Sequence, residues 1–355
     1  MDSASSHPRH RQGGFQPPHC PNPRCAFHRP NPHWRFAPRG SFVRHSDLHR
    51  FRAFRCCHCG RNFSPRSFSS SCGLRLRHLL IPIAAWLPEG PGLRQIGRVL
   101  GTSHTTVARY ATRLGHHCRL FQHAHLQNAS LAEPLVIDGF ESFARSQFFP
   151  FHANLAVGAD SWMIYHFTYS PLRRKGAMTP YQKLRRAELE LRLGRPDPKA
   201  VELGIVELLR PLLKLLPTDT LLLHSDDHPA YPRALRRLRT LVPNCPRIDH
   251  CITPSTVRRT QSNPLFPVNL ADLLLRHGSA NHRRETIAFS KCPRAAFERL
   301  AVFVVWRNFI KRRREKESWP TPTAAMRAGV IDRPLRWRQV LRRRLFPDHA
   351  DPPVV

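Results

Sequence analysis

The spacing of apolar and polar positions changes along the chain and divides it into regions. Between residues 76 and 128, apolar side chains recur every three or four positions, which is typical of helices with one buried face. From residue 134, short apolar runs alternate with longer segments of helical period. Residues 20–75 have few long apolar runs, so this segment needs a cross-link or a metal to form a stable core. The pattern predicts a multidomain α/β protein.

The segment 129–316 has the pattern of the largest domain. We expect its strands at residues 135–138, 151–157, 162–167, 221–225 and 247–253. We expect its helices at residues 181–193, 200–216, 231–241, 268–278 and 294–316. Three strands followed by alternating helices and strands is the order of a ribonuclease H-like core, a mixed five-stranded sheet flanked by helices. In that fold the first and fourth strands are neighbours.

Four shorter segments accompany this core. Residues 1–19 are rich in His, Pro, Gly and Arg, so we expect a disordered arm. We interpret residues 20–75 as a zinc ribbon and residues 76–128 as a helix-turn-helix DNA-binding domain. Residues 317–355 are expected to be a basic, proline-rich tail that contains one helix at 335–345.

Six of the ten cysteines lie in the segment interpreted as the ribbon. They include a Cys-x4-Cys pair and a Cys-x2-Cys pair, which together can present four thiolates to Zn²⁺ in a tetrahedron. We therefore predict a structural zinc site made by Cys20, Cys25, Cys56 and Cys59. The alternative ligands are Cys57, His58 and His28, and we expect buried thiols at Cys72, Cys118, Cys245, Cys251 and Cys292.

Residues 92–113 have the pattern of two helices joined by a tight turn. Gly101 suits the turn, and Thr102 or Ser103 suits the N-cap of the second helix. The polar face of that helix would then be free to enter a groove of DNA. An ordinary helical hairpin would show the same pattern. The candidate DNA contacts are His104, Thr105, Arg109 and Arg113.

The charge of the chain narrows the class of partner. The 57 Lys and Arg residues outnumber the 24 Asp and Glu residues, which gives a formal net charge of +33. Such an excess favours a polyanionic partner, and nucleic acid fits best. The first residues lack the apolar core of a signal peptide, and no apolar run is long enough for a transmembrane helix. We therefore expect an intracellular protein.

Three aspartates stand where a metal-dependent nuclease needs carboxylates. Asp138 and Asp226 each end an apolar run that we expect to be a buried strand, and Asp272 lies on a late helix. If the two strands are neighbours, the first two carboxylates converge. Two divalent ions about 3.5–4 Å apart can then stabilise both the attacking and the leaving oxygen of a phosphodiester.

Nearby residues offer alternatives and additions to these three carboxylates. Asn269, Asp272 and Arg276 are spaced by three and four residues, so they share one face of the late helix. A simple surface ion pair between Asp272 and Arg276 would be the alternative to a metal site. The further candidates are Asp227 in place of Asp226, Glu285 in place of Asp272, Glu141 as a neighbour of Asp138, Asn269 as a neutral ligand, and Arg276 as a contact to the scissile phosphate.

Three stretches resemble the bacterial insertion-sequence transposases of the DDE/DDD class. Residues 54–63 are similar to the family's zinc-ribbon knuckle. Residues 225–231 are similar to the motif of its second acid, in which an aspartate precedes a tyrosine by five positions. Residues 269–276, followed by Arg-x-Thr-x-x-Phe-Ser-Lys at 284–291, resemble its third-acid helix. In many members the last acid is a glutamate, whereas this chain has Asp272.

The resemblance implies a transposase that binds the inverted repeats at the ends of a DNA element. It implies two Mg²⁺ or Mn²⁺ ions, hydrolysis of a phosphodiester and transfer of the freed strand to double-stranded target DNA. It also implies a homodimer or larger assembly on DNA, in the bacterial cytoplasm at the nucleoid. The alternatives are a non-catalytic DNA-binding regulator derived from a transposase and a nuclease of the same fold that cuts without rejoining.

Overall fold

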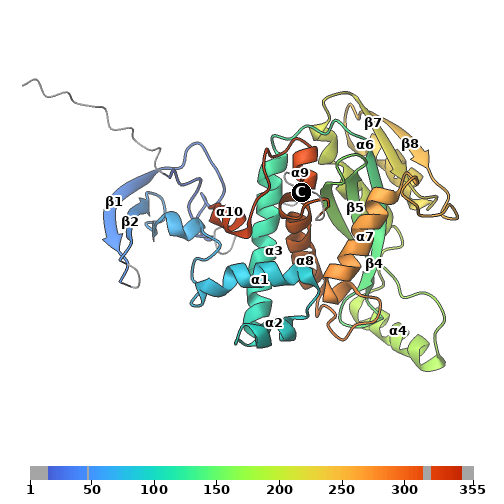
Figure 1. Cartoon of the computed structure of the whole chain (residues 1–355), viewed down its shortest axis with the longest axis horizontal. Helices are drawn as coiled ribbons and strands as arrows, with labels where there is room; N and C mark the ends of the chain where they lie inside the picture. Colours follow the sequence, from blue (N-terminus) through green and yellow to red (C-terminus); the bar gives the residue numbers. More distant parts are fainter. Residues whose placement is uncertain (1–14, 46–47, 315–320, 346–355) are drawn as a thin grey trace, which may run out of the picture. The chain divides into compact units, whose positions relative to one another are not determined.

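The computed structural model describes residues 15–45, 48–314 and 321–345. These residues form two compact units (Figure 1). Unit 1 contains the described residues of Met1–Leu74 together with 344–345, and unit 2 contains those of Arg75–Arg343. The predicted boundary between residues 128 and 129 is therefore not a boundary between compact units. The segments on both sides of it pack into unit 2.

Unit 1 is a small antiparallel sheet of three strands, in the order β1 (Phe36–Val43), β2 (Arg50–Cys56) and β3 (Asn62–Phe63). A short 3-10 helix, η1 (Pro65–Phe68), follows the last strand. Residues 15–19 are not the free arm that we expected, because the Phe15 ring lies 5.5 Å from the Phe68 ring. The rest of the predicted arm, residues 1–14, lies outside the described residues. The core is made of aromatic rings and cysteines: Trp34, Phe54, Phe63, Phe68, Cys20, Cys25 and Cys56.

Unit 2 is built on a mixed five-stranded sheet of order β6-β5-β4-β7-β8. The first three strands are antiparallel, and β7 and β8 run parallel to β4. The expected adjacency of the first and fourth strands is therefore present. The strands are β4 (Leu135–Phe143), β5 (Pro150–Gly158), β6 (Ile164–Pro171), β7 (Thr220–Ser225) and β8 (Arg247–Ile252).

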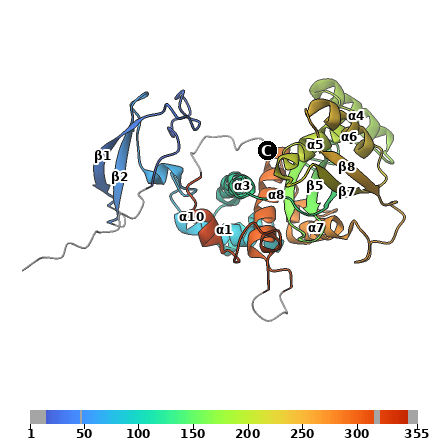
Figure 2. The same ribbon diagram turned by 90° about the horizontal axis from the view of Figure 1, so that it is seen from above.

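Helices cover both faces of this sheet (Figure 2). Two of the expected helices are shorter than predicted. The helix expected at 200–216 ends before Pro211, which cannot donate a backbone hydrogen bond. The helix expected at 294–316 becomes a π-helical turn after Val305. One face is covered by α7 (Phe266–Gly278), η5 (Ala280–His282) and α8 (Pro293–Val305) with its π turn η6 (Trp306–Ile310). The other face is covered by α5 (Ala200–Leu209), η4 (Leu212–Leu215) and α6 (Ala230–Leu241). The helix α4 (Pro180–Leu193) precedes α5 in the chain.

The N-terminal helices of unit 2 are tied to this sheet by the longest helix, α3 (His104–Leu126). Gln122 of α3 donates hydrogen bonds to the carbonyl oxygens of Ile164 (2.9 Å) and Tyr165 (3.0 Å) on β6. α3 also packs along α8, so its two ends cannot belong to separate domains. The helices before it are η2 (Arg77–Leu79), α1 (Leu80–Trp86), η3 (Leu87–Glu89) and α2 (Leu93–Val99).

The segment after α8 is also part of unit 2, at least as far as it is described. Thr323, Ala324 and Ala325 are buried around α9 (Ala324–Arg327), and Val340 is buried on α10 (Trp337–Arg342). Residues 321–343 therefore belong to unit 2, and a helix, α10, lies within the range 335–345 in which we expected one. Among the described residues, no helix is both long and apolar enough to cross a membrane.

The close packing of α3 on α8 gives a stability prediction. A Cβ atom added to Gly115 would lie within 2.5 Å of the Cα of Glu298 on α8, so the helices must separate to accept it. We expect Gly115→Ala to lower the free energy of unfolding of unit 2 by about 1–3 kcal/mol, measured from the urea midpoint. Gly92→Ala is the control, because its Cβ would meet its nearest neighbour at an ordinary 3.4 Å. Equal losses in both variants would contradict this account of the helix contact.

Candidate functional site

Asp138 faces the side of the sheet that α7 covers. Side chains alternate between the two faces of a strand, and the neighbours of Asp138 on its face are Val136 and Phe140, which are buried in the core with α7 and α8. Contrary to our expectation, Asp138 does not end its strand, because β4 continues beside β5 as far as Phe143. It does lie just beyond the last parallel pairing with β7, at Val136.

The register of β4 and β7 places Asp226 on the same face. Val136 is paired with His224, and residues paired directly across a sheet share a face. Two residues further along each strand come Asp138 and Asp226, the latter just past the end of β7. Asp226 Oδ1 accepts a hydrogen bond of 3.0 Å from the backbone N–H of His228, which fixes the carboxylate at the start of the following turn.

Asp272 joins them from α7. Its neighbours on the helix, Ala271 and Leu275, are buried in the core beneath the sheet. Its Oδ1 atom is shielded from solvent and has no hydrogen-bond partner among the described residues. Burial raises the pKa of Asp272 well above its ordinary value, the charge of Asp138 adds to this, and Arg276 and Arg259 oppose it.

Tyr231 lies close enough to all three aspartates for their charges to shift the pKa of its phenol. Burial raises the pKa of its phenol well above the ordinary value, and the charges of Asp138, Asp226 and Asp272 raise it further. The protonated phenol donates a hydrogen bond to Asp138. A second donor is the backbone N–H of Gly139, 2.7 Å from Asp138 Oδ1. The sequence pattern used Tyr231 only as a marker for Asp226.

The aspartates act on one another as a group of like charges. Burial raises the pKa of Asp138 to about 6, and Asp226 contributes to the rise. Carboxylate oxygens, one of them without a partner, are the donors that Mg²⁺ and Mn²⁺ prefer, so the chemistry of the set fits such an ion. The spacing is wider than a closed metal site. Among the described residues, only the cysteine group brings three or more ligand atoms within 4.8 Å of one another.

The other candidates on and around α7 differ in position. Asn269 lies one turn before Asp272, and its Nδ2 atom is buried without a partner. Arg276 is turned towards backbone carbonyl oxygens, those of His282 (3.3 Å) and Glu141 (3.2 Å), instead of forming the surface ion pair with Asp272. Glu285 is exposed, and no contact ties it to the three aspartates in the described structure.

Asp227, the alternative to Asp226, also lies apart from the group of three aspartates. Asp227 is exposed, and its Oδ2 atom lies 3.5 Å from the hydroxyl of Ser255. The pKa shifts of Asp138 and Tyr231 are caused in part by Asp226, and Asp227 is not among their causes. The structure therefore favours Asp226 as the second member of the group.

Sequence reasoning missed His152 on β5. Its ring lies on the opposite face of the sheet from Asp138, where a Cβ on Gly139 would come within 2.6 Å of its Nδ1 atom. That nitrogen is buried without a partner. Burial lowers the pKa of His152, whereas Glu141 and Asp226 oppose this. The glycine directly after Asp138 was the available signal, because a strand interior rarely benefits from one.

A basic cleft opens beside this histidine. It has a volume of about 1090 Å³, and Glu141, His152 and His228 line one part of it. His152 and His228 lie near Asp226, so the cleft reaches the sheet edge at which the second acid stands. Seven basic side chains line other parts of the wall, together with Asp197, Glu202 and several apolar residues: Arg173, Arg174, Lys175, Arg186, Arg195, Lys199 and Arg233.

The residues predicted to contact DNA lie around the start of α3. Gly101 makes the turn after α2 with φ of 61°, and the Ser103 hydroxyl caps α3 by accepting from the N–H of Thr106 at 3.2 Å. His104, Thr105 and Arg109 are exposed beyond this cap, whereas Arg113 is half-buried. The turn and the cap are those we expected. The same geometry suits an ordinary helical hairpin.

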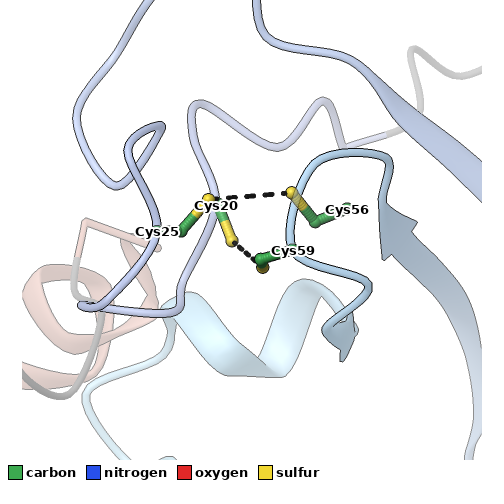
Figure 3. Close-up of side chains that lie close together, drawn as sticks. All are labelled: Cys20, Cys25, Cys56 and Cys59. Atoms are coloured by element: carbon green, nitrogen blue, oxygen red, sulfur yellow. Dashed lines mark hydrogen bonds between the residues drawn. The ribbon is translucent and has the colours of Figure 1, made fainter.

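Unit 1 contains a second candidate site, the group of four cysteines (Figure 3). The Sγ atoms of Cys20 and Cys59 lie 3.6 Å apart, and those of Cys25 and Cys56 lie 4.0 Å apart. All four lie within 4.8 Å of one another, so the group can bind a structural metal such as zinc. The alternative ligands are elsewhere: Cys57 is exposed, the His58 ring packs on Phe27, and His28 Nδ1 is 3.0 Å from the Cys20 carbonyl oxygen.

N–H donors favour the thiolate form at Cys56 and Cys59, whereas burial raises the pKa of Cys20 and of Cys25 above the ordinary value. The Trp34 indole lies 3.3 Å from Cys56 Sγ, and the backbone N–H of Asn22 lies 3.4 Å from Cys20 Sγ. Burial alone would raise the pKa of Cys56, but the backbone N–H of Cys59 and the Trp34 indole outweigh it and lower the pKa to about 6. Five other thiols were expected to be buried. Cys118 is buried, Cys251 is exposed, and the remaining three are half-buried: Cys72, Cys245 and Cys292.

The cysteine geometry predicts the effect of removing one ligand. We expect Cys20→Ser to lose nearly all bound zinc, measured by mass spectrometry of the metal, and to make residues 15–74 sensitive to protease. Cys57→Ser is the matched control, because this exposed thiol lies in the same knuckle but outside the group. Full zinc content in Cys20→Ser would show that the four cysteines are not the ligands.

The raised pKa of Asp138 predicts a pH dependence. Because its folded pKa is about 6 and its ordinary value is 3.8, its contribution to stability is fully present below pH 3.8 and is lost as the pH rises through 6. Without divalent ions, Asp138→Asn should therefore gain stability relative to the wild type between pH 4 and pH 7.5, by about 2–3 kcal/mol. Chemical denaturation at both pH values measures this difference. Asp227→Asn is the control, and the same gain in both variants would refute the assignment.

Comparison with known protein families and with curated proteins gives no match to this chain. The evidence for function therefore comes from the chain itself. It consists of the three aspartates on one face of the sheet, the basic cleft that reaches His228 next to Asp226, the exposed polar start of α3 and the four cysteines of unit 1.

Proposed function

We propose that this chain is a DNA transposase of the DDE/DDD class with a ribonuclease H-like catalytic core. The strand order and directions support the fold: three antiparallel strands with two further strands parallel to the first. The observation that carries the proposal is the register of β4 and β7, which puts Asp138 and Asp226 on the face of the sheet that α7, the helix of Asp272, covers. A central strand, the end of its parallel neighbour and a late helix each supply one carboxylate to the same face.

In this proposal Asp138, Asp226 and Asp272 hold two Mg²⁺ or Mn²⁺ ions, and Asn269 is close enough along α7 to add a neutral oxygen. The ions, when bound, supply Lewis-acid stabilisation of the attacking and leaving oxygens. Tyr231 and the N–H of Gly139 hold the Asp138 carboxylate in one orientation. Arg276, fixed over the Phe140 ring at 4.4 Å, places positive charge beside the site for a phosphate.

Double-stranded DNA is the proposed substrate. The net charge of +33 favours a polyanionic partner, and the basic cleft reaches the sheet edge of Asp226. His104, Thr105 and Arg109 at the exposed start of α3 would contact the DNA ends, as the second helix of a helix-turn-helix does. The cysteine group, with zinc bound, would hold the fold of unit 1 as a further DNA-binding module. Such a protein would act in the bacterial cytoplasm at the nucleoid.

A second candidate function is a non-catalytic DNA-binding regulator that is derived from a transposase. The observation in its favour is the spacing of the three carboxylates, which do not all lie within 4.8 Å of one another in the described structure. A hydrolytic nuclease of the same fold would share every residue named above. It would differ in releasing its product instead of joining the freed 3′-hydroxyl to a second DNA.

The test is cleavage of a supercoiled plasmid that carries the DNA flanking the gene. We expect nicks at the element ends with Mg²⁺ and none with EDTA, and we expect joined products in which a freed strand enters target DNA. Asp138→Asn, Asp226→Asn and Asp272→Asn should each reduce cleavage at least about 10³-fold and leave DNA binding intact. Asp227→Asn is the control.

The outcomes separate the three functions. Cutting without joined products would identify the nuclease. Tight binding without any cutting would identify the regulator. Cleavage that survives in Asp138→Asn would show that the carboxylates are wrongly assigned.

A further inference from the structure

The helix α4 (Pro180–Leu193) exposes apolar side chains on a face that nothing in the described chain covers. None of its fourteen residues is buried. Tyr181 is 73% exposed, Leu184 72% and Leu191 91%. Figure 1 shows α4 at the margin of unit 2, beyond the sheet and its covering helices. A helix without a buried face gains little stability from tertiary packing, so its order must have another source.

Local contacts supply that order and fix which face points outward. Thr179 and Gln182 form a reciprocal capping box, with the backbone N–H of each bonded to the side chain of the other. On the inner side, Arg173 makes a two-pronged ion pair with Glu190 at 2.8 and 3.0 Å. Arg186 also reaches inward and donates to the Arg174 carbonyl oxygen at 3.0 Å. Glu190 and Arg186 thus anchor one face, and the apolar face is held towards solvent.

The outward face has the spacing of a helix–helix seam. Tyr181, Leu184, Glu188 and Leu191 follow one another at intervals of three and four residues, which is a heptad pattern. Three of the four positions are apolar. The fourth, Glu188, forms an ion pair with Arg185 on its own helix. A seam interrupted by one ion pair is suited to a partner of defined register and direction.

We infer that α4 docks, antiparallel, on the α4 of a second copy of this chain. A twofold axis at the level of Arg186 places Tyr181 of one copy opposite Leu191 of the other, and Leu184 opposite Glu188. Both Arg185–Glu188 pairs then meet at the axis, so that two positive and two negative charges come together. A parallel pairing would place Glu188 against Glu188 within an apolar seam. The face is therefore self-complementary in the antiparallel direction, which fits a copy of the same helix.

The interface would be small, because each helix contributes fewer than four turns. We therefore expect association that depends on concentration, in a range from about 1 µM to about 100 µM. The inference does not depend on the proposed chemistry. If that chemistry holds, the contact would keep two copies together when each binds one DNA end.

Sedimentation equilibrium of the full chain without DNA tests the interface. We expect a dimer for the wild type and a monomer for Leu184→Glu, with at least about tenfold weaker association. Leu241→Glu is the control, since Leu241 is also exposed and lies on α6, away from the seam. α4 has no buried residue, so circular dichroism and the melting temperature should stay unchanged in Leu184→Glu.

Charge exchange tests the antiparallel register. Glu188→Arg alone brings four positive charges to the axis, and Arg185→Glu alone brings four negative charges, so each variant should be monomeric. An equimolar mixture of the two should form a heterodimer, because the two positive charges of one copy then meet the two negative charges of the other. A wild type that stays monomeric, a dimer that survives Leu184→Glu, or single charge variants that do not rescue one another would each overturn the inference.

Discussion

The position of β4 between an antiparallel and a parallel neighbour is the constraint on which the candidate site depends. Pairing with β5 continues along the whole length of β4 and past Asp138, whereas pairing with β7 ends at Val136. The side chain of Asp138 therefore stands at the step where β7 stops and the chain turns to Asp226. Because α7 lies under this step, the sheet and the helix together force three carboxylates onto one half-buried face.

This arrangement costs stability in the absence of a cation, because like charges are held in a poorly hydrated place. The raised pKa of Asp138 and the partnerless oxygen of Asp272 are the signs of that cost. Tyr231 offsets part of it by donating to Asp138, and the packing of α3, α8 and α7 supplies the rigidity to maintain it. A site that is unfavourable when empty and acceptable when two positive ions enter is what metal-dependent phosphodiester chemistry needs.

The sequence predicted the strands of the sheet and the four cysteines that lie together, because apolar period, turn residues and ligand spacing are local signals. That Asp138, Asp226 and Asp272 bind metal ions stays a prediction. The sequence did not predict that α3 joins unit 2, since the contacts of Gln122 with β6 link residues far apart in the chain. For the same reason it missed His152, and it did not predict that residues 321–343 pack into unit 2. Arg276 was placed on the correct helix face, but its carbonyl partners depend on tertiary packing. Whether the three aspartates can hold ions likewise depends on distances between elements, which no local pattern encodes.

The central claim is that the three aspartates form a divalent-cation site. The most direct measurement is a crystal structure of the full chain soaked with Mn²⁺, with the ions located by anomalous scattering. The account predicts a peak within bonding distance of Asp138 and Asp226, with Asp272 moved towards it from its present position. A map with no peak beside these residues, although Mn²⁺ saturates the crystal, would contradict it.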